Sequence, residues 1–246
     1  MNKGTLMKKL TIITGANSGV GKAISLKLAN EGYPLLLIDL NLEIVKKEVN
    51  HENIHFFEAD VTKYDQLQRA IKYGEAKMGP IENMINNAGV MVLERADLQN
   101  YEVIARQNEI NINGVIFGTQ IALQSMIKSQ SGTIINLSSI AGIKSFENHS
   151  AYCGSKFAVR GYSETVRGEV ADKNIRVSII SPGVIKTKLL EGTTNPEIKQ
   201  NYETWRDENN AFIEARDIAN IVHFILNQPQ SVTIREIVVG PTTQVE

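Results

Sequence analysis

Short apolar runs alternate with amphipathic stretches along most of the chain. The apolar runs predict buried β-strands over residues 10–14, 35–38, 54–58, 83–86, 133–137, 176–180 and 233–239. Helical periodicity between them predicts helices over residues 22–30, 42–49, 63–78, 98–124, about 150–172 and 216–226. Apolar strands separated by helices are typical of an α/β fold, so we expect a doubly wound parallel sheet with helices on both faces.

Two stretches depart from this alternation. The long helical stretch is expected to break or bend near Asn111 to Gly114. The segment from about 186 to 210 is polar and rich in Glu, Asn and Thr, and such segments often close over active sites, so we predict a substrate lid there. No repeat, low-complexity tract or Pro/Gly linker divides the chain, which predicts a single domain over residues 1–246.

Composition narrows the classes of function. With 42% hydrophobic and 22% charged residues, the chain is typical of soluble globular proteins. A formal net charge of -1 gives no electrostatic case for binding nucleic acid or an anionic membrane. No apolar run approaches the roughly 18 residues that suggest a transmembrane helix. The one cysteine, Cys153, excludes an internal disulfide and fits a reducing cytoplasm.

A glycine-rich turn follows the first predicted strand. Gly15, Gly19 and Gly21 stand in a G-x-x-x-G-x-G spacing between the apolar run at 10–14 and the helix at 22–30. Missing side chains let the backbone approach a pyrophosphate, and a helix N-terminus offers free N–H donors. The commoner dinucleotide fingerprint is G-x-G-x-x-G, so the evidence here is the order strand, glycine turn, helix. This order predicts a nucleotide site.

Asp39 ends the second predicted strand, about 20 residues past the glycines, where a carboxylate takes the adenosine ribose hydroxyls. A carboxylate at this place would repel a 2′-phosphate. We therefore expect NAD to be preferred, with NADP as the less favoured cofactor. The alternative is that Asp39 caps the helix at 42–49.

Tyr152 and Lys156 stand four residues apart on a predicted helix, so they share one face. A free phenol has a pKa of about 10, and a nearby positive charge favours the phenolate and lowers that pKa. A general acid or base works best with a pKa near the working pH. The pair therefore suits proton transfer, although a lone Tyr-x-x-x-Lys is most often part of an ordinary amphipathic helix.

The rest of the chain supplies the context for this pair. Motifs occur in order at Thr14 to Gly21, at Asp60, at Asn86-Asn87-Ala88-Gly89, at Ser139 with Tyr152 and Lys156, and at Pro182-Gly183 followed by Thr187. With these motifs the chain resembles the short-chain dehydrogenase/reductase family, in its single-domain subgroup of about 250 residues. The resemblance covers about residues 9–239 and implies a Rossmann fold.

The resemblance implies an oxidoreductase that interconverts a secondary alcohol and a ketone or aldehyde by hydride transfer with NAD(P). Tyr152 would be the general acid/base, and Ser139 would hydrogen-bond the substrate oxygen. Lys156 would bond the nicotinamide ribose and lower the pKa of Tyr152. Asn111, three residues before a glycine, would hold a water in a proton relay. Family habit also implies a homodimer or homotetramer.

Further residues are expected to touch the cofactor or the substrate. The expected cofactor-binding residues are Gly15, Asn17, Ser18, Gly19, Val20, Gly21, Asp39, Asp60, Val61, Asn87, Ala88, Gly89, Tyr152, Lys156, Pro182, Gly183, Ile185 and Thr187. Residues that follow the Asn-Ala-Gly motif or precede Tyr152 are candidates for the substrate pocket, namely Val90, Met91, Phe146, Asn148 and His149. Trp205 would cover the pocket or anchor the polar segment.

Other functions remain open at this stage. A protein of the same fold that binds a nucleotide for regulation, without turnover, would not need Ser139, Tyr152 and Lys156 together. An epimerase or dehydratase would usually have a longer C-terminal substrate region. The four histidines are scattered without a carboxylate or cysteine pattern, so no metal site is expected. Cys153 is expected to be a structural small residue rather than a nucleophile, because neighbours on a helix face different ways.

Overall fold

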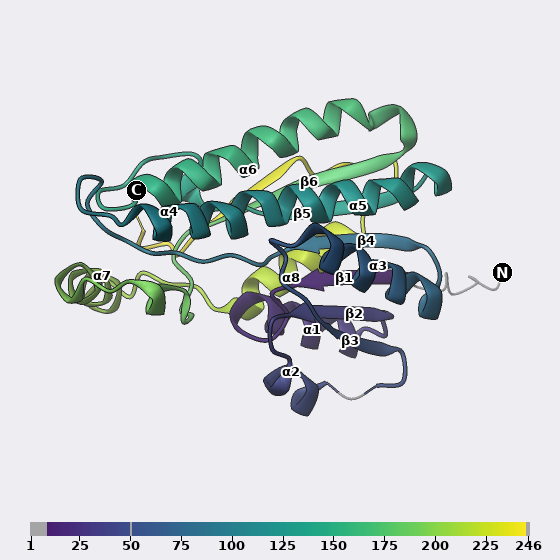
Figure 1. The fold of residues 1–246 in the computed structure, drawn as a ribbon, viewed down its shortest axis with the longest axis horizontal. Coiled ribbons are helices and arrows are strands. Elements are labelled where there is room, and N and C mark those ends of the chain that lie inside the picture. The colour runs from purple at the N-terminus through teal and green to yellow at the C-terminus, as the bar shows by residue number, and fades with distance from the viewer. Residues whose placement is uncertain (1–8, 50, 245–246) are drawn as a thin grey trace.

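The computed structural model describes residues 9–49 and 51–244; the remaining residues of the predicted domain lie outside this description. The described residues contain a seven-stranded sheet in the order β3-β2-β1-β4-β5-β6-β7, shown in Figure 1. Its strands are β1 Leu10–Thr14, β2 Leu35–Asp39, β3 Ile54–Glu58, β4 Ile81–Asn86, β5 Gly132–Leu137, β6 Ile175–Pro182 and β7 Glu236–Val239. Every pair of neighbouring strands is parallel. The predicted α/β fold with a parallel sheet is confirmed.

The chain order reverses beside β1. From β1 the chain continues outward through β2 and β3, then crosses back so that β4 pairs with the other side of β1. In open parallel sheets, ligands bind outside the carboxyl ends of the strands at such a switch point. The loops after β1 and β4 are therefore the place where a binding site is expected.

Helices cover both faces of the sheet (Figure 1). The helices are α1 Gly19–Asn30, α2 Glu43–Glu48, α3 Tyr64–Met78, α4 Tyr101–Asn108, α5 Gly114–Ser129, α6 Ser150–Glu169, α7 Pro196–Glu208 and α8 Ala215–Leu226. One apolar core joins α1, α2 and α8 to the strands, with Ile24, Val45 and Val222 fully buried. A second joins α3, α5 and α6 to the opposite face. In the part of the chain that the structure describes, no helix is long and apolar enough to cross a membrane.

The predicted break in the long helix is a π-helical segment. Residues Glu109–Asn113 separate α4 from α5, and the Gly114 N–H donates to the Glu109 carbonyl, five residues earlier. Isolated π segments are rare and occur frequently at functional sites. Asn111 lies within it, with no exposed surface. Its side chain accepts from the Val90 N–H at 2.9 Å and donates to the Val90 carbonyl at 2.9 Å, which ties the long helix to the loop after β4.

Two of the differences from the sequence prediction concern the last strand and the polar segment. The last strand begins at Glu236 rather than at residue 233, because arginine side chains hold the segment before it: Arg176 donates to the Val232 carbonyl and Arg167 to the Arg235 carbonyl. The polar segment at 186–210 contains α7, which begins after Asn195 with Pro196 in its first turn. The Asn195 side chain accepts from the Glu197 and Ile198 N–H groups, a cap that an amphipathicity search does not detect.

Candidate active site

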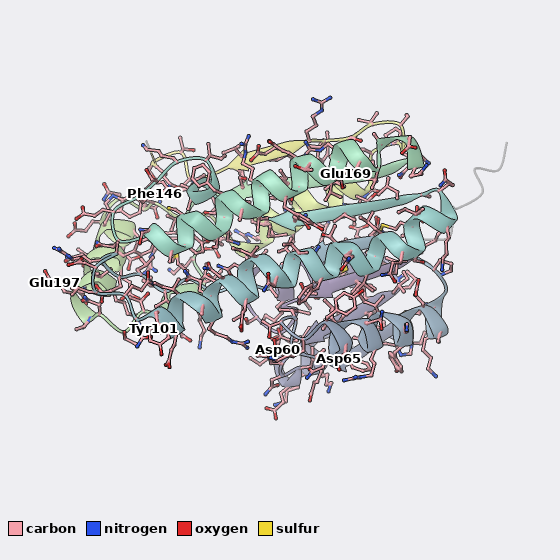
Figure 2. The ribbon with its side chains drawn as sticks, turned by 45° about the horizontal axis from the view of Figure 1, so that its top comes forward. Asp60, Asp65, Tyr101, Phe146, Glu169 and Glu197 are labelled. Carbon is pink, nitrogen blue, oxygen red and sulfur yellow. The ribbon has the colours of Figure 1, made fainter. Side chains whose placement is uncertain are left out.

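A cavity of about 1210 Å³ lies outside the carboxyl ends of the strands. Its walls come from the loops after β1 to β6, from α4 and α6, and from the segment that holds α7. Figure 2 labels Phe146 on the loop before α6, Glu197 on the first turn of α7 and Asp60 on the loop after β3. Predicted site residues that line the cavity are Gly15, Ser18, Gly19, Val20, Asp39, Asp60, Val61, Asn87, Ala88, Gly89, Val90, Met91, Ser139, Phe146, Asn148, His149, Tyr152, Lys156, Pro182, Gly183, Ile185 and Thr187.

Three predicted site residues lie behind the lining. The Asn17 side chain accepts from the Ile44 and Val45 N–H groups at 3.0 Å each, so it supports the first turn of α2. Gly21 packs so closely on the Gly15 carbonyl that a side chain has no room. Asn111 is enclosed by Val90 and by the Ser155 hydroxyl. These residues shape the loops that form the site.

The glycine turn fits a pyrophosphate. Gly15 and Gly19 adopt φ of 66° and 49°, conformations that L side chains rarely take. A Cβ on Gly15 would lie 2.8 Å from the Ala88 Cα, so the turn packs directly on the loop after β4. Ser18 precedes α1 without capping it through its side chain, which leaves the first N–H groups of the helix free for an anion.

Asp39 stands at the cavity wall and does not cap α2. Its two carboxylate oxygens accept from the N–H groups of Asn17 at 2.8 Å and Leu40 at 2.7 Å. These bonds hold the carboxylate beside the glycine turn. On the adjoining helices, Lys22 of α1 pairs with Glu48 at 2.8 Å and Lys46 of α2 pairs with Glu58 at 3.5 Å.

Asp60 is fixed by a residue that the sequence analysis missed. Arg106 on α4 donates to Asp60 Oδ2 at 3.1 Å and to the Thr62 hydroxyl at 3.0 Å. Burial acts to raise the pKa of Asp60, but hydrogen bonds from Thr62 and Arg106 outweigh it and hold that pKa below its usual value. Arg106 lies far from Asp60 in sequence and belongs to no motif, so the sequence carried no signal for the pair.

Tyr152, Lys156 and Ser139 meet on the cavity wall. Tyr152 and Lys156 are each 6% exposed on α6, as their spacing predicts. The Lys156 ammonium donates to the Leu137 carbonyl at 3.0 Å and lies 5.7 Å from the centre of the Tyr152 ring. The Ser139 hydroxyl accepts from the Ala141 N–H at 3.1 Å and donates to the Pro182 carbonyl at 3.3 Å.

Burial controls the ionisation of this pair when no cofactor is present. It raises the pKa of Tyr152 well above that of a free phenol, and a hydrogen bond with Ser139 opposes this rise. Burial also lowers the pKa of Lys156 to about 8. The expected lowering of the Tyr152 pKa by Lys156 is therefore not the dominant effect in the cofactor-free protein, since both charged forms lose their hydration.

The wall around Tyr152 is largely apolar. Met91, Leu93, Ala141, Cys153 and Leu190 form a buried cluster with Tyr152. Cys153 thus acts as a packing residue, in agreement with its expected structural role. Phe146, Ile198 and Tyr202 pack against this cluster, and Trp205 contacts Tyr202 with ring centroids 6.1 Å apart. Of the residues of α7 that line the cavity, the sequence singled out Trp205 but not Ile198 or Tyr202, because the polar segment gave no indication of which other side chains turn inward.

No group of three or more His, Cys, Asp or Glu side chains able to hold a metal ion occurs in residues 9–49 and 51–244.

Comparison with known proteins bears on the family of this chain. The sequence profile described as short chain dehydrogenase matches residues 9–197. An uncharacterised oxidoreductase of Staphylococcus saprophyticus is 33% identical over 243 residues, which cover 96% of this chain and 97% of the relative. A diacetyl reductase of Staphylococcus epidermidis, named as forming (S)-acetoin, is 34% identical over 236 residues, which cover 89% of this chain and 91% of the relative. An alcohol dehydrogenase of Thermococcus sibiricus, complexed with 5-hydroxy-NADP, superposes with a TM-score of 0.84 at 23% identity over 96% and 98% of the chains, a likeness of fold.

The chain belongs to the short-chain dehydrogenase family. The predicted resemblance is confirmed, and with it the prediction of an NAD(P)-dependent oxidoreductase of alcohols and ketones.

The burial of Lys156 predicts a pH-dependent cost to stability. Its pKa is about 8 in the folded protein against an ordinary 10.5, so the cost of burying the charge is present below pH 8 and disappears as the pH rises towards 10.5. Lys156→Met should therefore stabilise the cofactor-free protein by about 3 kcal/mol at neutral pH, and by much less above pH 10. Urea unfolding of both proteins across this range measures the difference.

A constant offset between the two proteins at every pH would contradict this prediction. Such an offset would reflect the lost hydrogen bond to Leu137 alone.

Proposed function

We propose that the chain interconverts a secondary alcohol and a ketone or aldehyde, with NAD as the preferred hydride carrier and Tyr152 as the general acid/base. The observation that supports it most strongly is the shared wall of one cavity: Ser139, Tyr152 and Lys156 lie together, and the glycine turn lines the same cavity. The cofactor carries the hydride at its nicotinamide ring.

The residues that would hold the cofactor are inferred from those that line the cavity. Gly15, Gly19 and the first N–H groups of α1 would take the pyrophosphate, and Asp39 the adenosine ribose hydroxyls. Asp60 and Val61 would lie against the adenine. Lys156 would bond the nicotinamide ribose; Ile185 and Thr187 would meet the carboxamide. The free N–H donors and the absence of side chains at the turn support this assignment.

The protein's part in the reaction is orientation and proton transfer. The Ser139 and Tyr152 hydroxyls would hydrogen-bond the substrate oxygen. In oxidation the substrate hydroxyl proton would pass to the Tyr152 oxygen, and in reduction it would return. Lys156 keeps a positive charge near the phenol, which favours its ionised form. Asn111 donates both of its side-chain amide hydrogens, one to the Val90 carbonyl and one to the Ser155 hydroxyl. A relay water would therefore have to donate a hydrogen bond to an oxygen atom of Asn111.

Removal of the phenol hydroxyl tests this function. Tyr152→Phe keeps the ring and its packing, so cofactor binding should survive while turnover falls by roughly 10²–10⁴. Tyr162→Phe is a matched control, because Tyr162 lies on the same helix but is partly buried against the core and does not line the cavity. Alcohol oxidation followed by NADH absorbance, with NAD titration, measures both effects.

Near wild-type turnover in Tyr152→Phe would contradict the proposed mechanism. Loss of activity in both variants would show a general effect of the substitution on folding.

NAD preference is proposed from Asp39. Asp39 lines the cavity, and the Asn17 N–H holds its carboxylate beside the glycine turn. A 2′-phosphate placed there would therefore meet a negative charge. NADP remains the alternative, since the Thermococcus sibiricus enzyme is complexed with an NADP derivative.

Replacement of Asp39 should change the cofactor. The wild type should be more efficient with NAD, and Asp39→Arg should shift the preference towards NADP by replacing repulsion with attraction. Asp172→Arg makes the same charge change at an exposed site after α6 and should leave the preference unchanged. The two values of kcat/KM for each protein measure the shift, and a wild-type preference for NADP would overturn the role of Asp39.

A lid is proposed for the segment at 186–210. Asn195 donates to both Glu94 carboxylate oxygens, at 3.2 and 3.1 Å, and the Leu93 N–H donates to the Thr193 hydroxyl at 3.0 Å. These bonds attach the segment to the loop after β4. The Leu93–Thr193 bond is buried, whereas the bonds between Asn195 and Glu94 are partly exposed, and we expect the segment to open when no ligand packs beneath it.

Hydrogen exchange tests the lid. Exchange over residues 196–208 should slow when NAD and substrate bind. Asn195→Asp keeps a capping oxygen but sets a carboxylate against Glu94, so the free protein should exchange faster there. In the double variant Glu94→Gln and Asn195→Asp, position 94 carries the donor and position 195 the acceptor, the reverse of the wild type. This variant should recover the slower exchange. Equal hydrogen-exchange rates with and without ligands would contradict the proposal of a lid.

A cytoplasmic homodimer or homotetramer is also proposed. The free, buried Cys153 is compatible with a reducing compartment. Large apolar side chains exposed on the chain support association, with Phe157 on α6 at 45%, Phe224 on α8 at 52% and Val238 on β7 at 57%.

A further inference from the structure

His149 presents a hydrogen-bond acceptor to the cavity. Its Nδ1 lies 2.6 Å from the Glu147 carbonyl oxygen, and a carbonyl oxygen can only accept, so Nδ1 carries the proton. Burial lowers the pKa of His149, which keeps the ring neutral at physiological pH. In a neutral imidazole with a proton on Nδ1, Nε2 holds a free lone pair. No hydrogen bond from the residues that the structure describes reaches this atom.

The imidazole stands next to the reaction centre. His149 lies one helical turn before Tyr152, and the two ring centroids are 6.4 Å apart. Phe146 and Tyr202 enclose the other sides of the ring, at 5.7 and 6.1 Å. His149 and Tyr152 both line the cavity. A small molecule bonded to the Tyr152 hydroxyl therefore has His149 as its neighbour on the substrate side.

The surrounding chemistry favours a neutral partner. Met91, Leu93 and Leu190 make this wall apolar. Among the cations that line the cavity, Arg206 donates to both carboxylate oxygens of Asp207 at 2.7 and 2.9 Å, and Lys188 pairs with Glu191 at 3.5 Å. A substrate carboxylate would be repelled by the Nε2 lone pair. A hydroxyl would supply the missing donor.

We propose that His149 Nε2 accepts a hydrogen bond from a hydroxyl on the carbon next to the reacting one, so that the enzyme acts on vicinal diols and α-hydroxy ketones. This inference rests on the proposed function of the same site. The hydroxyl selects the substrate, whereas Tyr152 and Ser139 act on the neighbouring oxygen. A substrate that lacks the second hydroxyl would cover Nε2 without offering it a donor, which costs binding.

Matched substrates and two amide variants test the proposal. The substrates are butan-2-ol with butane-2,3-diol, and 1-phenylethanol with 1-phenylethane-1,2-diol. The wild type should favour the diol of at least one pair by about tenfold in kcat/KM, as expected for one hydrogen bond. His149→Asn can keep the bond to Glu147 but does not reach the position of Nε2, so it should lose this preference. His149→Gln places a carbonyl oxygen near that position and should retain most of it.

Controls separate this proposal from the general function. His51→Asn makes the same change on an exposed loop outside the cavity and should leave the preference unchanged. Equal efficiency for alcohol and diol in the wild type, or an unchanged preference in His149→Asn, would overturn the role of His149 while leaving the oxidoreductase intact. If neither class of substrate is oxidised with NAD or NADP, the proposed function fails, and this inference fails with it.

Discussion

Burial of a phenol beside an ammonium is the constraint on which the site depends. Lys156 has lost most of its hydration, and its neutral hydrogen-bond partner is the Leu137 carbonyl. Burial raises the pKa of Tyr152 and lowers the pKa of Lys156 to about 8, so it disfavours the charged form of both residues, while Lys156 still carries most of its positive charge at neutral pH. A cationic nicotinamide would change this balance, because a positive charge favours the phenolate. Under the proposed function, proton transfer would thereby be linked to cofactor binding.

Side-chain amides hold the loops around this pair. Asn87 donates to the Thr14 and Gly15 carbonyls, which joins the loop after β4 to the glycine turn. Asn111 joins the same loop to the π segment, and Asn195 joins α7 to Glu94. Loops carry function when a rigid scaffold positions them. Here each loop is fixed by a few hydrogen bonds that run between segments far apart in sequence.

The sequence predicted the sheet, the glycine turn and the proximity of Tyr152 to Lys156, because each depends on local spacing. Tyr152 and Lys156 share a face by helical geometry, and the apolar runs read directly as parallel strands. The sequence did not reveal that Asn17 supports α2 or that Arg106 fixes Asp60, because these contacts join distant segments. It also did not predict α7. Its inward side chains Ile198 and Tyr202 stand among many polar residues, so the helix shows no clear apolar pattern in the sequence.

The most direct test of the account is the titration of Tyr152 itself. The phenolate absorbs in the near ultraviolet, so the pH-dependent difference between wild type and Tyr152→Phe isolates this residue. Without cofactor, Tyr152 should ionise above the value of about 10 that is usual for a free phenol. With saturating NAD the transition should move to lower pH. The same transition with and without NAD, or ionisation below about 10 in the free protein, would contradict the claim that burial and cofactor charge together control the acid/base residue.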